Sequence, residues 1–268
     1  VRGLKTFLSD EIAKFQFGIY TGKVDVLVGL PLSFNIAFAT VLVPSISKLM
    51  AQKKKEDANK VVKFSLLATI LIGLPCTFGM MVFAEQILKL LYPNAPEGAQ
   101  LLQITSLTII LMMMAQTING VLQGIGKYRV PATALALGVI AKFILNLILI
   151  PIPSIGINGV AIGSIVCHII SFSIGFAVLK RSMKIKFDVN KFLIKPLLAT
   201  AIMCLISYLA YLLLVQFISW KLSAIVAIIL AVPIYALAVA IMKILDKEEI
   251  TVIYNKKIND KTYYTPST

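Results

Sequence analysis

A single lysine stands near the middle of an apolar stretch that runs from about residue 131 to residue 153. If this stretch is a helix, the Cα of Lys142 lies about 16 Å from the nearer end, at 1.5 Å of rise per residue. A cation at that depth in a bilayer costs roughly 2.5–3.5 kcal/mol, so Lys142 is expected to face the bundle interior or a water-filled cavity. Asn146, one turn further on, shares its face and could hold the ammonium. Lys142 is then either a structural lysine bonded to helix carbonyls or amides, or a cation that meets an anionic substrate or takes part in ion coupling.

Three amides recur within the preceding apolar stretch. Gln116, Asn119 and Gln123 are spaced by three and four residues, so they share one face of a helix. An amide in hydrocarbon must bond to a neighbouring helix or border water. These side chains are therefore either interhelical hydrogen-bonding groups or the lining of a polar cavity. Gly120, Gly124 and Gly126 would let another helix approach closely.

The remaining candidates are one acid, one amide and the only histidine of the chain. Asp25 and Asn35 bracket the opening half of the first apolar stretch; Asn35 is a cavity candidate, whereas Asp25 is close enough to the membrane surface to be solvated. His168 falls in the middle of a later stretch, with Ser164 and Ser171 on nearby helical faces. A hydrogen-bonded helix contact is the simpler role for His168, and ion coupling is the alternative for Asp25 and His168.

The sequence contains no recognisable catalytic motif. The sequence has no HExxH, CxxC pair, GxSxG or Walker A motif, and one histidine cannot build a multi-histidine site. Cys76, Cys167 and Cys204 are solitary and fall in three different apolar stretches, which predicts neither disulfides nor a metal cluster. The sequence thus predicts no enzyme, no metal site and no cofactor.

These candidates must be positioned by membrane-spanning helices. The chain is 59% hydrophobic and only 14% charged, with a mean hydropathy of +0.91, whereas soluble domains carry about 25% charged residues. A helix of about 20 apolar residues crosses a bilayer. The sequence predicts an all-α, polytopic membrane protein with about seven spans, near residues 24–47, 61–84, 101–125, 131–153, 156–179, 193–217 and 222–245.

The basic residues alternate between the loops. Loops on one side of the predicted membrane and the tail collect nineteen lysines and arginines, and the loops on the other side collect Lys89 and Lys221. Basic loops face the cytoplasm, so we expect a multi-pass plasma-membrane protein with a cytoplasmic C-terminus, its lysines touching anionic membrane lipids. The net charge of +14 does not indicate nucleic-acid binding, because no aromatic residues interleave with these cations. The nineteen are Lys48, Lys53, Lys54, Lys55, Lys60, Lys63, Lys127, Arg129, Lys180, Arg181, Lys184, Lys186, Lys191, Lys195, Lys243, Lys247, Lys256, Lys257 and Lys261.

The two ends of the chain differ from its middle. Within residues 1–23, apolar side chains recur at helical spacing with charged ones between them, which predicts an amphipathic segment at the membrane interface. Residues 246–268 are expected to form a cytoplasmic tail. The chain begins with valine and has an odd number of spans, so we expect it to be a fragment of a longer protein.

Two long patterns resemble a family of membrane transporters. The first is GIYTGKVDVLVGLPLSFNIAFATVLVPSISKLMAQ, and the second is NGVLQGIGKYRVPATAL followed by KFILNLILIPIPSIGINGVAIGSIV. Both are similar to polysaccharide-type exporters of the multidrug/oligosaccharidyl-lipid/polysaccharide superfamily. The branch that contains stage V sporulation protein B and the lipid II flippase MurJ is the most similar, over about residues 1–245.

The resemblance implies a fold of fourteen helices in two six-helix lobes plus two additional C-terminal helices. Residues 24–179 would supply helices of the C-terminal lobe, residues 180–245 the additional pair, and the missing N-terminal half of the same protein would be a partner. It further implies a flippase, working by alternating access, for an undecaprenyl-pyrophosphate-linked saccharide or a peptidoglycan precursor. Such a headgroup needs cations, for which Lys142 is the first candidate, with Arg2 and Lys5 at the rim.

Two other functions remain open at the level of the sequence. A cation-coupled multidrug exporter of the same superfamily would need buried carboxylates, and Asp25 is the only acidic residue near a span. A non-transporting membrane scaffold would tolerate changes at the polar positions of its spans.

Overall fold

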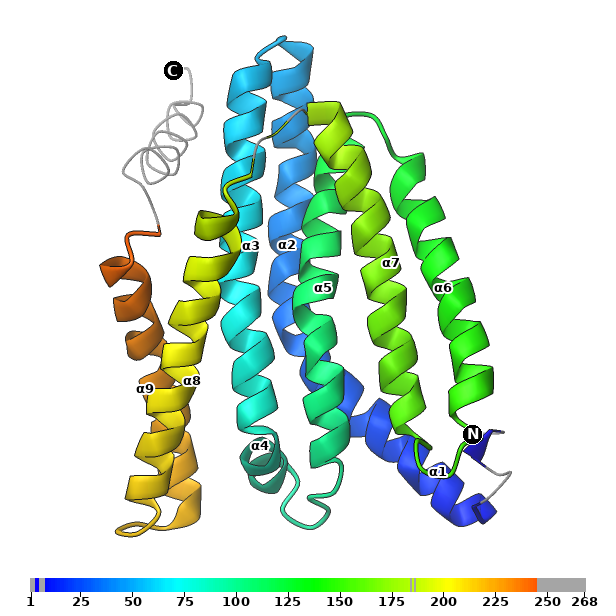
Figure 1. The fold of residues 1–268 in the computed structure, drawn as a ribbon, viewed down its shortest axis with the longest axis vertical. Coiled ribbons are helices and arrows are strands. Elements are labelled where there is room, and N and C mark those ends of the chain that lie inside the picture. The colour runs from blue at the N-terminus through cyan, green and yellow to red at the C-terminus, as the bar shows by residue number, and fades with distance from the viewer. Residues whose placement is uncertain (1–2, 5–7, 184, 186, 245–268) are drawn as a thin grey trace, which may run out of the picture.

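The computed structural model describes residues 3–4, 8–183, 185 and 187–244, and these are helical for most of their length (Figure 1). Two of the segments have π-helical hydrogen bonding, and both run directly into a longer α-helix. In chain order the elements are α1 Asp10–Ile19, η2 Tyr20–Val24, α2 Asp25–Ala51, α3 Lys55–Val82, α4 Ala84–Leu91, α5 Ala99–Gly124, α6 Arg129–Leu149, α7 Asn158–Met183, η3 Asn190–Ile194, α8 Lys195–Leu214 and α9 Trp220–Ile241.

The prediction of an all-α polytopic membrane protein is confirmed. Within the described residues, seven helices are long and apolar enough to cross a membrane. Each overlaps a predicted span and differs from it by a few residues at the ends, except at the start of the first. There the helix continues backward from α2 through η2 into α1, giving one helical run over Asp10–Ala51. The boundary predicted at residue 23 coincides with the π-helical segment.

The loops alternate between two opposite ends of the bundle (Figure 1). The α2–α3, α5–α6 and α7–α8 connections lie at the end we call cation-rich, because they carry the basic clusters found in the sequence. The segment α1, the short helix α4 and the α6–α7 and α8–α9 connections lie at the opposite end, which we call cation-poor. The alternation of charge along the sequence is therefore also a separation in space.

Helix α5 is the centre of the bundle, because α2, α3 and α7 all pack against it. Glycines make the closest of these contacts: a Cβ added at Gly120 would lie 2.7 Å from the carbonyl oxygen of Ala39 on α2. A Cβ at Gly124 would lie 2.8 Å from the Cβ of Ile46. The predicted close approach is confirmed at Gly120 and Gly124, where α2 and α5 pack backbone against backbone. It is wrong at Gly126, which follows the end of α5 and where an added Cβ would meet nothing within 4 Å.

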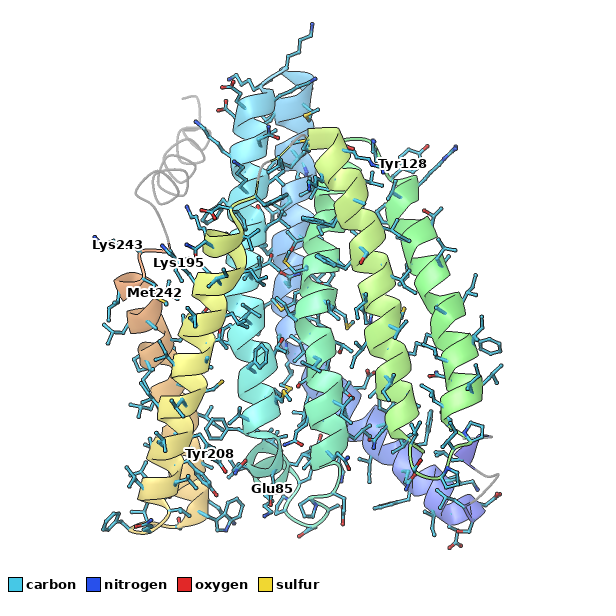
Figure 2. The ribbon with its side chains drawn as sticks, in the orientation of Figure 1. Glu85, Tyr128, Lys195, Tyr208, Met242 and Lys243 are labelled. Carbon is cyan, nitrogen blue, oxygen red and sulfur yellow. The ribbon has the colours of Figure 1, made fainter. Side chains whose placement is uncertain are left out.

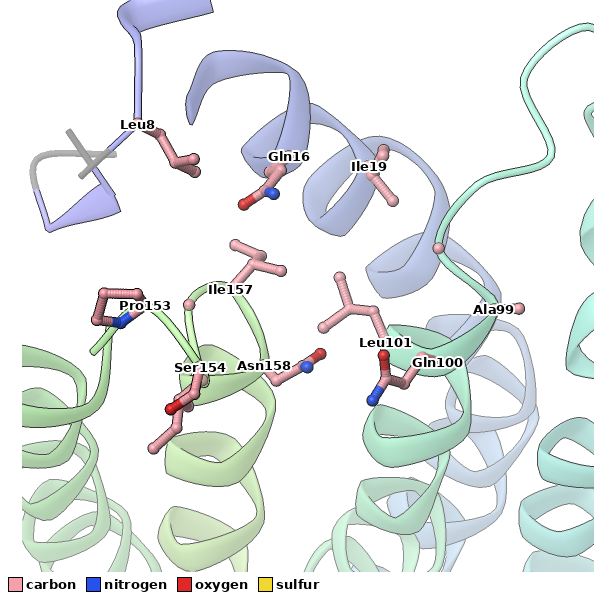
Figure 3. A pocket seen from close by; sticks show the side chains of 13 residues that line it. Leu8, Gln16, Ile19, Ala99, Gln100, Leu101, Pro153, Ser154, Ile157 and Asn158 are labelled. Carbon is pink, nitrogen blue, oxygen red and sulfur yellow. The ribbon is translucent and has the colours of Figure 1, made fainter. Parts of the chain in front are cut away.

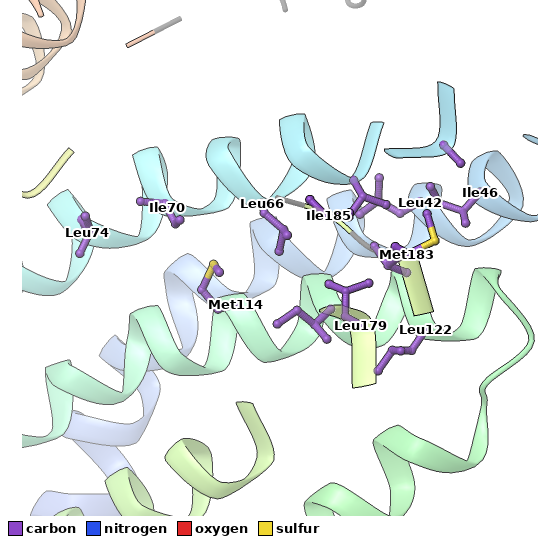
Figure 4. Packing of buried hydrophobic residues seen from close by; sticks show 14 residues of the cluster. Leu42, Ile46, Leu66, Ile70, Leu74, Met114, Leu122, Leu179, Met183 and Ile185 are labelled. Carbon is purple, nitrogen blue, oxygen red and sulfur yellow. The ribbon is translucent and has the colours of Figure 1, made fainter. Parts of the chain in front are cut away.

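A continuous apolar cluster fills the cation-rich half of the bundle (Figure 4). Leu42 of α2, Leu66 of α3, Leu122 of α5 and Leu179 of α7 are all at most 3% exposed. This cluster joins the four inner helices. By contrast, α6 contacts α7 along its length and has little other contact, so most of its apolar side chains are exposed.

The last two spans form a hairpin that packs on one side of the bundle. Helices α8 and α9 contact each other closely, α8 contacts α3, and α9 touches α4. The side chain of Lys195, at the start of α8, donates a hydrogen bond of 3.2 Å to the carbonyl of Met242, just beyond α9 (Figure 2). This bond ties the two helices together at the cation-rich end.

The short helix α4 was not predicted. Its eight residues, Ala84–Leu91, are too few to cross a membrane and follow α3 with only Phe83 between them. Ala84 and Leu88 are buried, whereas Glu85 and Lys89 on the other face are exposed and form an i,i+4 ion pair of 2.5 Å. The helix therefore lies at the cation-poor end with one face on the bundle.

Replacement of Gly120 tests the backbone contact between α2 and α5. Gly120→Ala places a methyl group against the backbone of Ala39, which cannot move without shifting α2, so we expect a loss of about 1–3 kcal/mol in unfolding free energy. Gly79→Ala is the matched control on α3, where the new Cβ meets only the terminal methyl of Met203 at 3.9 Å. Unfolding in detergent should separate the two variants, and equal stability would contradict the contact.

Candidate functional site

A buried polar network joins three of the four inner helices, α2, α3 and α5. The side-chain amide of Asn35 on α2 donates to the carbonyl of Met113 at 2.9 Å and to Oε1 of Gln116 at 3.0 Å, both on α5. The hydroxyl of Thr117 lies 3.5 Å from the same amide and 2.7 Å from the hydroxyl of Thr69 on α3. Asn35 is 4% exposed, so these groups act as interhelical hydrogen bonds in this structure.

Among the residues that the structure describes, the other two amides of the predicted α5 face have no such partner on a neighbouring helix. Helix α5 meets α2 through Gly120 and α7 through Ile118, which packs on Gly175. Asn119 and Gln123 lie on the side of α5 that remains, between the directions of α2 and α7. Asn119 is half-buried and Gln123 is exposed. Of the three predicted amides, these two are the ones that open toward the surface of the bundle.

Helix α2 presents exposed polar groups along one side. Asp25, Ser33, Thr40 and Ser47 are all exposed and recur at spacings of seven and eight residues, so they form one face, which we call the polar stripe of α2. The Ser33 hydroxyl donates to Gly29 O at 3.1 Å within the same helix. The Ser47 hydroxyl, at the end of the stripe, donates to Gly124 O on α5 at 3.0 Å. Asp25, Ser33 and Thr40 turn away from the buried side of α2 that carries Asn35, which leaves these three for water or another part of a larger protein.

Lys142 lies on the face of α6 that packs against α7. A Cβ added at Gly163 of α7 would lie 3.4 Å from Cγ of Lys142 and 2.4 Å from Oδ1 of Asn146. Lys142 is half-buried. The Oδ1 atom of Asn146 is buried and has no hydrogen-bond partner among the described residues. The predicted bond between Asn146 and the ammonium is therefore not formed in this structure, although both side chains do share one face.

His168 is half-buried on α7. Ser164, one turn before His168, has other partners: its hydroxyl donates to Val160 O at 2.8 Å and lies 3.5 Å from the hydroxyl of Tyr20. Asp25 is exposed near the start of α2. The structure thus does not bring the two ion-coupling candidates, Asp25 and His168, into one cluster.

The predicted rim cations Arg2 and Lys5 lie outside the described residues. A different cation near the start of the first span stands out instead. Lys23 of η2 donates to the carbonyl of Ala95, lies 3.7 Å from a carboxylate oxygen of Glu97 and stands 5.4 Å from the ring centre of Tyr92. Its side chain is 13% exposed, so Lys23 fastens the start of the first span to the loop between α4 and α5. Its neighbours in sequence gave no sign of these partners.

A pocket of about 420 Å³ lies at the cation-poor end, between α1, the start of α5 and the α6–α7 connection (Figure 3). Its polar side chains are uncharged: Gln16, Gln100, Ser154 and Asn158. Oε1 of Gln16 is buried and has no hydrogen-bond partner among the described residues. None of the sequence-predicted site residues that the structure describes lines this pocket, so it stands apart from the polar stripe and from Lys142.

Within the described residues, no group of three or more histidine, cysteine, aspartate or glutamate side chains could hold a metal ion. The three cysteines are free. The arrangement that the chain does offer is a half-buried cation on α6 together with uncharged polar groups on the open sides of α2 and α5.

Comparisons with known proteins show which proteins the chain is similar to. The model of the family "Lipid II flippase MurJ" matches residues 6–231. An uncharacterized membrane protein of Bacillus subtilis (strain 168), YabM, is 31% identical over 156 residues, which cover 58% of this chain and 29% of YabM.

Two further relatives come from the same organism. The lipid II flippase MurJ is 26% identical over 174 residues, or 63% of this chain and 32% of that protein. Stage V sporulation protein B is 26% identical over 175 residues, which cover 64% of this chain and 34% of that protein. The chain thus matches about a third of the length of each of these relatives.

Replacement of Asn35 tests the interhelical network. Asn35→Leu removes a donor and leaves the carbonyl of Met113 and the amide of Gln116 without it, so we expect a loss of about 1–2 kcal/mol in unfolding free energy. Gln123→Leu, at an exposed position, serves as the control and should change stability by less than about 0.5 kcal/mol. Unfolding of both variants in the same detergent measures the difference, and an unchanged Asn35→Leu protein would refute the network.

Proposed function

Because the chain belongs to the lipid II flippase MurJ family, we propose that it supplies helices to a flippase for a lipid-linked precursor. The transported molecule is an undecaprenyl-type lipid that carries a saccharide or peptidoglycan precursor through a pyrophosphate. The observation that carries the proposal is the family match over residues 6–231, most of the chain. We propose transport by alternating access, with no chemical change in the lipid.

The geometry of α2 and α5 supports a polar path along this part of the protein. A charged and sugar-bearing headgroup cannot cross hydrocarbon unaided, so a flippase must offer polar side chains or water through the depth of the membrane. The polar stripe of α2 extends along most of the helix, from Asp25 to Ser47. Asn119 and Gln123 add uncharged hydrogen-bonding groups on the open side of α5. We propose that these two surfaces border the path of the headgroup.

Lys142 is the cation that we assign to the headgroup. Its aliphatic stem rests on α7 at Gly163, and α6 is the least buried of the candidate membrane spans among the described residues. A lysine ammonium can pair with a phosphate oxygen and is mobile enough to follow it. The half-buried position costs free energy that an anionic ligand would offset.

The same proposal includes the surroundings of the chain. We propose that a further set of helices, the N-terminal half of the same protein, faces the polar stripe of α2 and completes the cavity. The chain matches about a third of its relatives' length, which supports a partner of this kind. In the proposed assembly α2 to α7 form the lobe and α8 and α9 the additional pair. The protein lies in the plasma membrane with the cation-rich end in the cytoplasm, by the positive-inside rule.

The role of Lys142 can be measured by lipid translocation. In proteoliposomes of the full-length protein, Lys142→Ala should lower the rate for an undecaprenyl-pyrophosphate-linked substrate by roughly tenfold or more, because one charge-assisted contact is lost. Lys142→Arg keeps the charge and should retain most of the activity. Lys14→Ala, at an exposed position on α1, is the control.

The possible results distinguish a failure of the role proposed for Lys142 from a failure of the proposed flippase function. A wild-type rate for Lys142→Ala, at equal amounts of folded protein, would remove Lys142 from the mechanism. If the wild-type protein moves no lipid-linked saccharide or peptidoglycan precursor, the proposed flippase function itself is refuted.

A further inference from the structure

A second cleft, of about 520 Å³, lies at the cation-poor end between α4, the segment that follows it and the α8–α9 connection. It is remote in the sequence from the polar stripe and from Lys142, and the proposed translocation path does not use it. The side chains that matter here are Glu85, Gln86 and Lys89 of α4, Tyr211 of α8, and Trp220 and Lys221 at the start of α9. The volume is in the range of small-ligand sites.

The two cations of this cleft are the only basic residues in the predicted loops of the cation-poor side. Lys89 pairs with Glu85 at 2.5 Å, and the hydrogen bond and charge of Glu85 raise the pKa of the Lys89 ammonium above its ordinary value. Lys221 stands 5.8 Å from the ring centre of Trp220. The charged residues that line the cleft are two lysines and one glutamate, which leaves a net charge of +1.

The cleft lies where lipid headgroups meet the protein. Trp220 is the only tryptophan of the chain, and tryptophan and tyrosine prefer the headgroup level of a bilayer. Leu91 on α4 and Leu222 beside Lys221 are 57% and 55% exposed. Apolar side chains next to the lysines would meet acyl chains, whereas a water-soluble ligand would leave them uncovered.

One wall of the cleft also carries a hydrogen-bond acceptor without a donor. Oε1 of Gln86 is buried and has no partner among the described residues. Gln86 lines the cleft, and its amide oxygen can accept a hydrogen bond from a hydroxyl group. The lining therefore favours a ligand that carries one negative charge and at least one hydroxyl group.

We propose that this cleft binds the phosphodiester headgroup of an anionic phospholipid with headgroup hydroxyls, as in phosphatidylglycerol. A phosphodiester carries a single negative charge, which balances the lining, and its oxygens accept from Lys89 and Lys221. The glycerol supplies the donor for Gln86, and the acyl chains run beside Leu91 and Leu222.

The bound lipid would join the α8–α9 hairpin to the bundle. On the hairpin side, the rings of Tyr208 and Tyr211 meet the ring of Phe83 edge-on at 6.3 and 6.4 Å. Figure 2 labels Tyr208 on α8 and Glu85 on α4, both toward the cation-poor end. A phosphate held by Lys89 on α4 and Lys221 on α9 adds a polar link beside these aromatic contacts. Phosphatidylglycerol should therefore stabilise the folded protein.

The test is lipid binding by the purified full-length protein in mixed micelles. Titration with phosphatidylglycerol, in a background of phosphatidylcholine, should raise the unfolding temperature of the wild-type protein. Lys89→Gln/Lys221→Gln should weaken this binding by roughly tenfold or more, since each lysine near a membrane surface attracts anionic lipid. Lys89→Arg/Lys221→Arg should bind like the wild type. Lys14→Gln removes one charge from the same end and should change little.

A further variant separates binding from a merely structural effect. Glu85→Gln removes the carboxylate and raises the net charge of the lining, so phosphatidylglycerol should bind more tightly even though the ion pair with Lys89 is gone. If Glu85→Gln weakens binding, or if the double glutamine variant keeps the wild-type response, the proposal is overturned. If inorganic phosphate alone gives the same lysine-dependent rise in unfolding temperature, the site binds free phosphate and its assignment to a lipid is wrong.

Discussion

The close contact between α2 and α5 is the constraint on which the rest of the structure depends. Water does not compete for polar groups inside a bilayer, and apolar side chains gain little by leaving lipid, so helices associate through tight packing and interhelical hydrogen bonds. Gly120 and Gly124 let the two backbones meet. Because the two helices lie so close together, Asn35 reaches the carbonyl of Met113 and the side-chain amide of Gln116. Because α3 and α7 also pack on α5, this one contact orients four spans.

This packing divides the polar residues into two groups. Asn35, Thr69 and Thr117 are satisfied inside the bundle and hold helices together. The polar stripe of α2 and the amides Asn119 and Gln123 lie on open surfaces. A soluble protein could present such groups to water. On a membrane-spanning helix they would face hydrocarbon unless water or another helix covers them. The proposed path for a polar headgroup, bordered by a second set of helices, would explain their exposure.

The spans could be predicted from the sequence because their signal is local. Length and hydropathy decide whether a helix crosses a membrane, and the charge of the loops alternates between the two ends. Helix α4 was missed because eight amphipathic residues are too short for such a signal. The sequence left the roles of Asn35 and Gln116 open, since a partner 81 positions away depends on how the helices pack. Lys23 escaped notice for the same reason: its partners lie on the loop before α5.

The central claim is that the polar stripe of α2 borders water in the full-length protein. Single cysteines would test it in a full-length variant in which the natural cysteines, including Cys76, Cys167 and Cys204, are replaced by alanine. We predict that Ser33→Cys and Thr40→Cys react with a water-soluble maleimide in intact membranes, whereas Phe34→Cys and Val41→Cys, on the neighbouring apolar side, react at least about tenfold more slowly. Equal protection of all four positions would contradict the account.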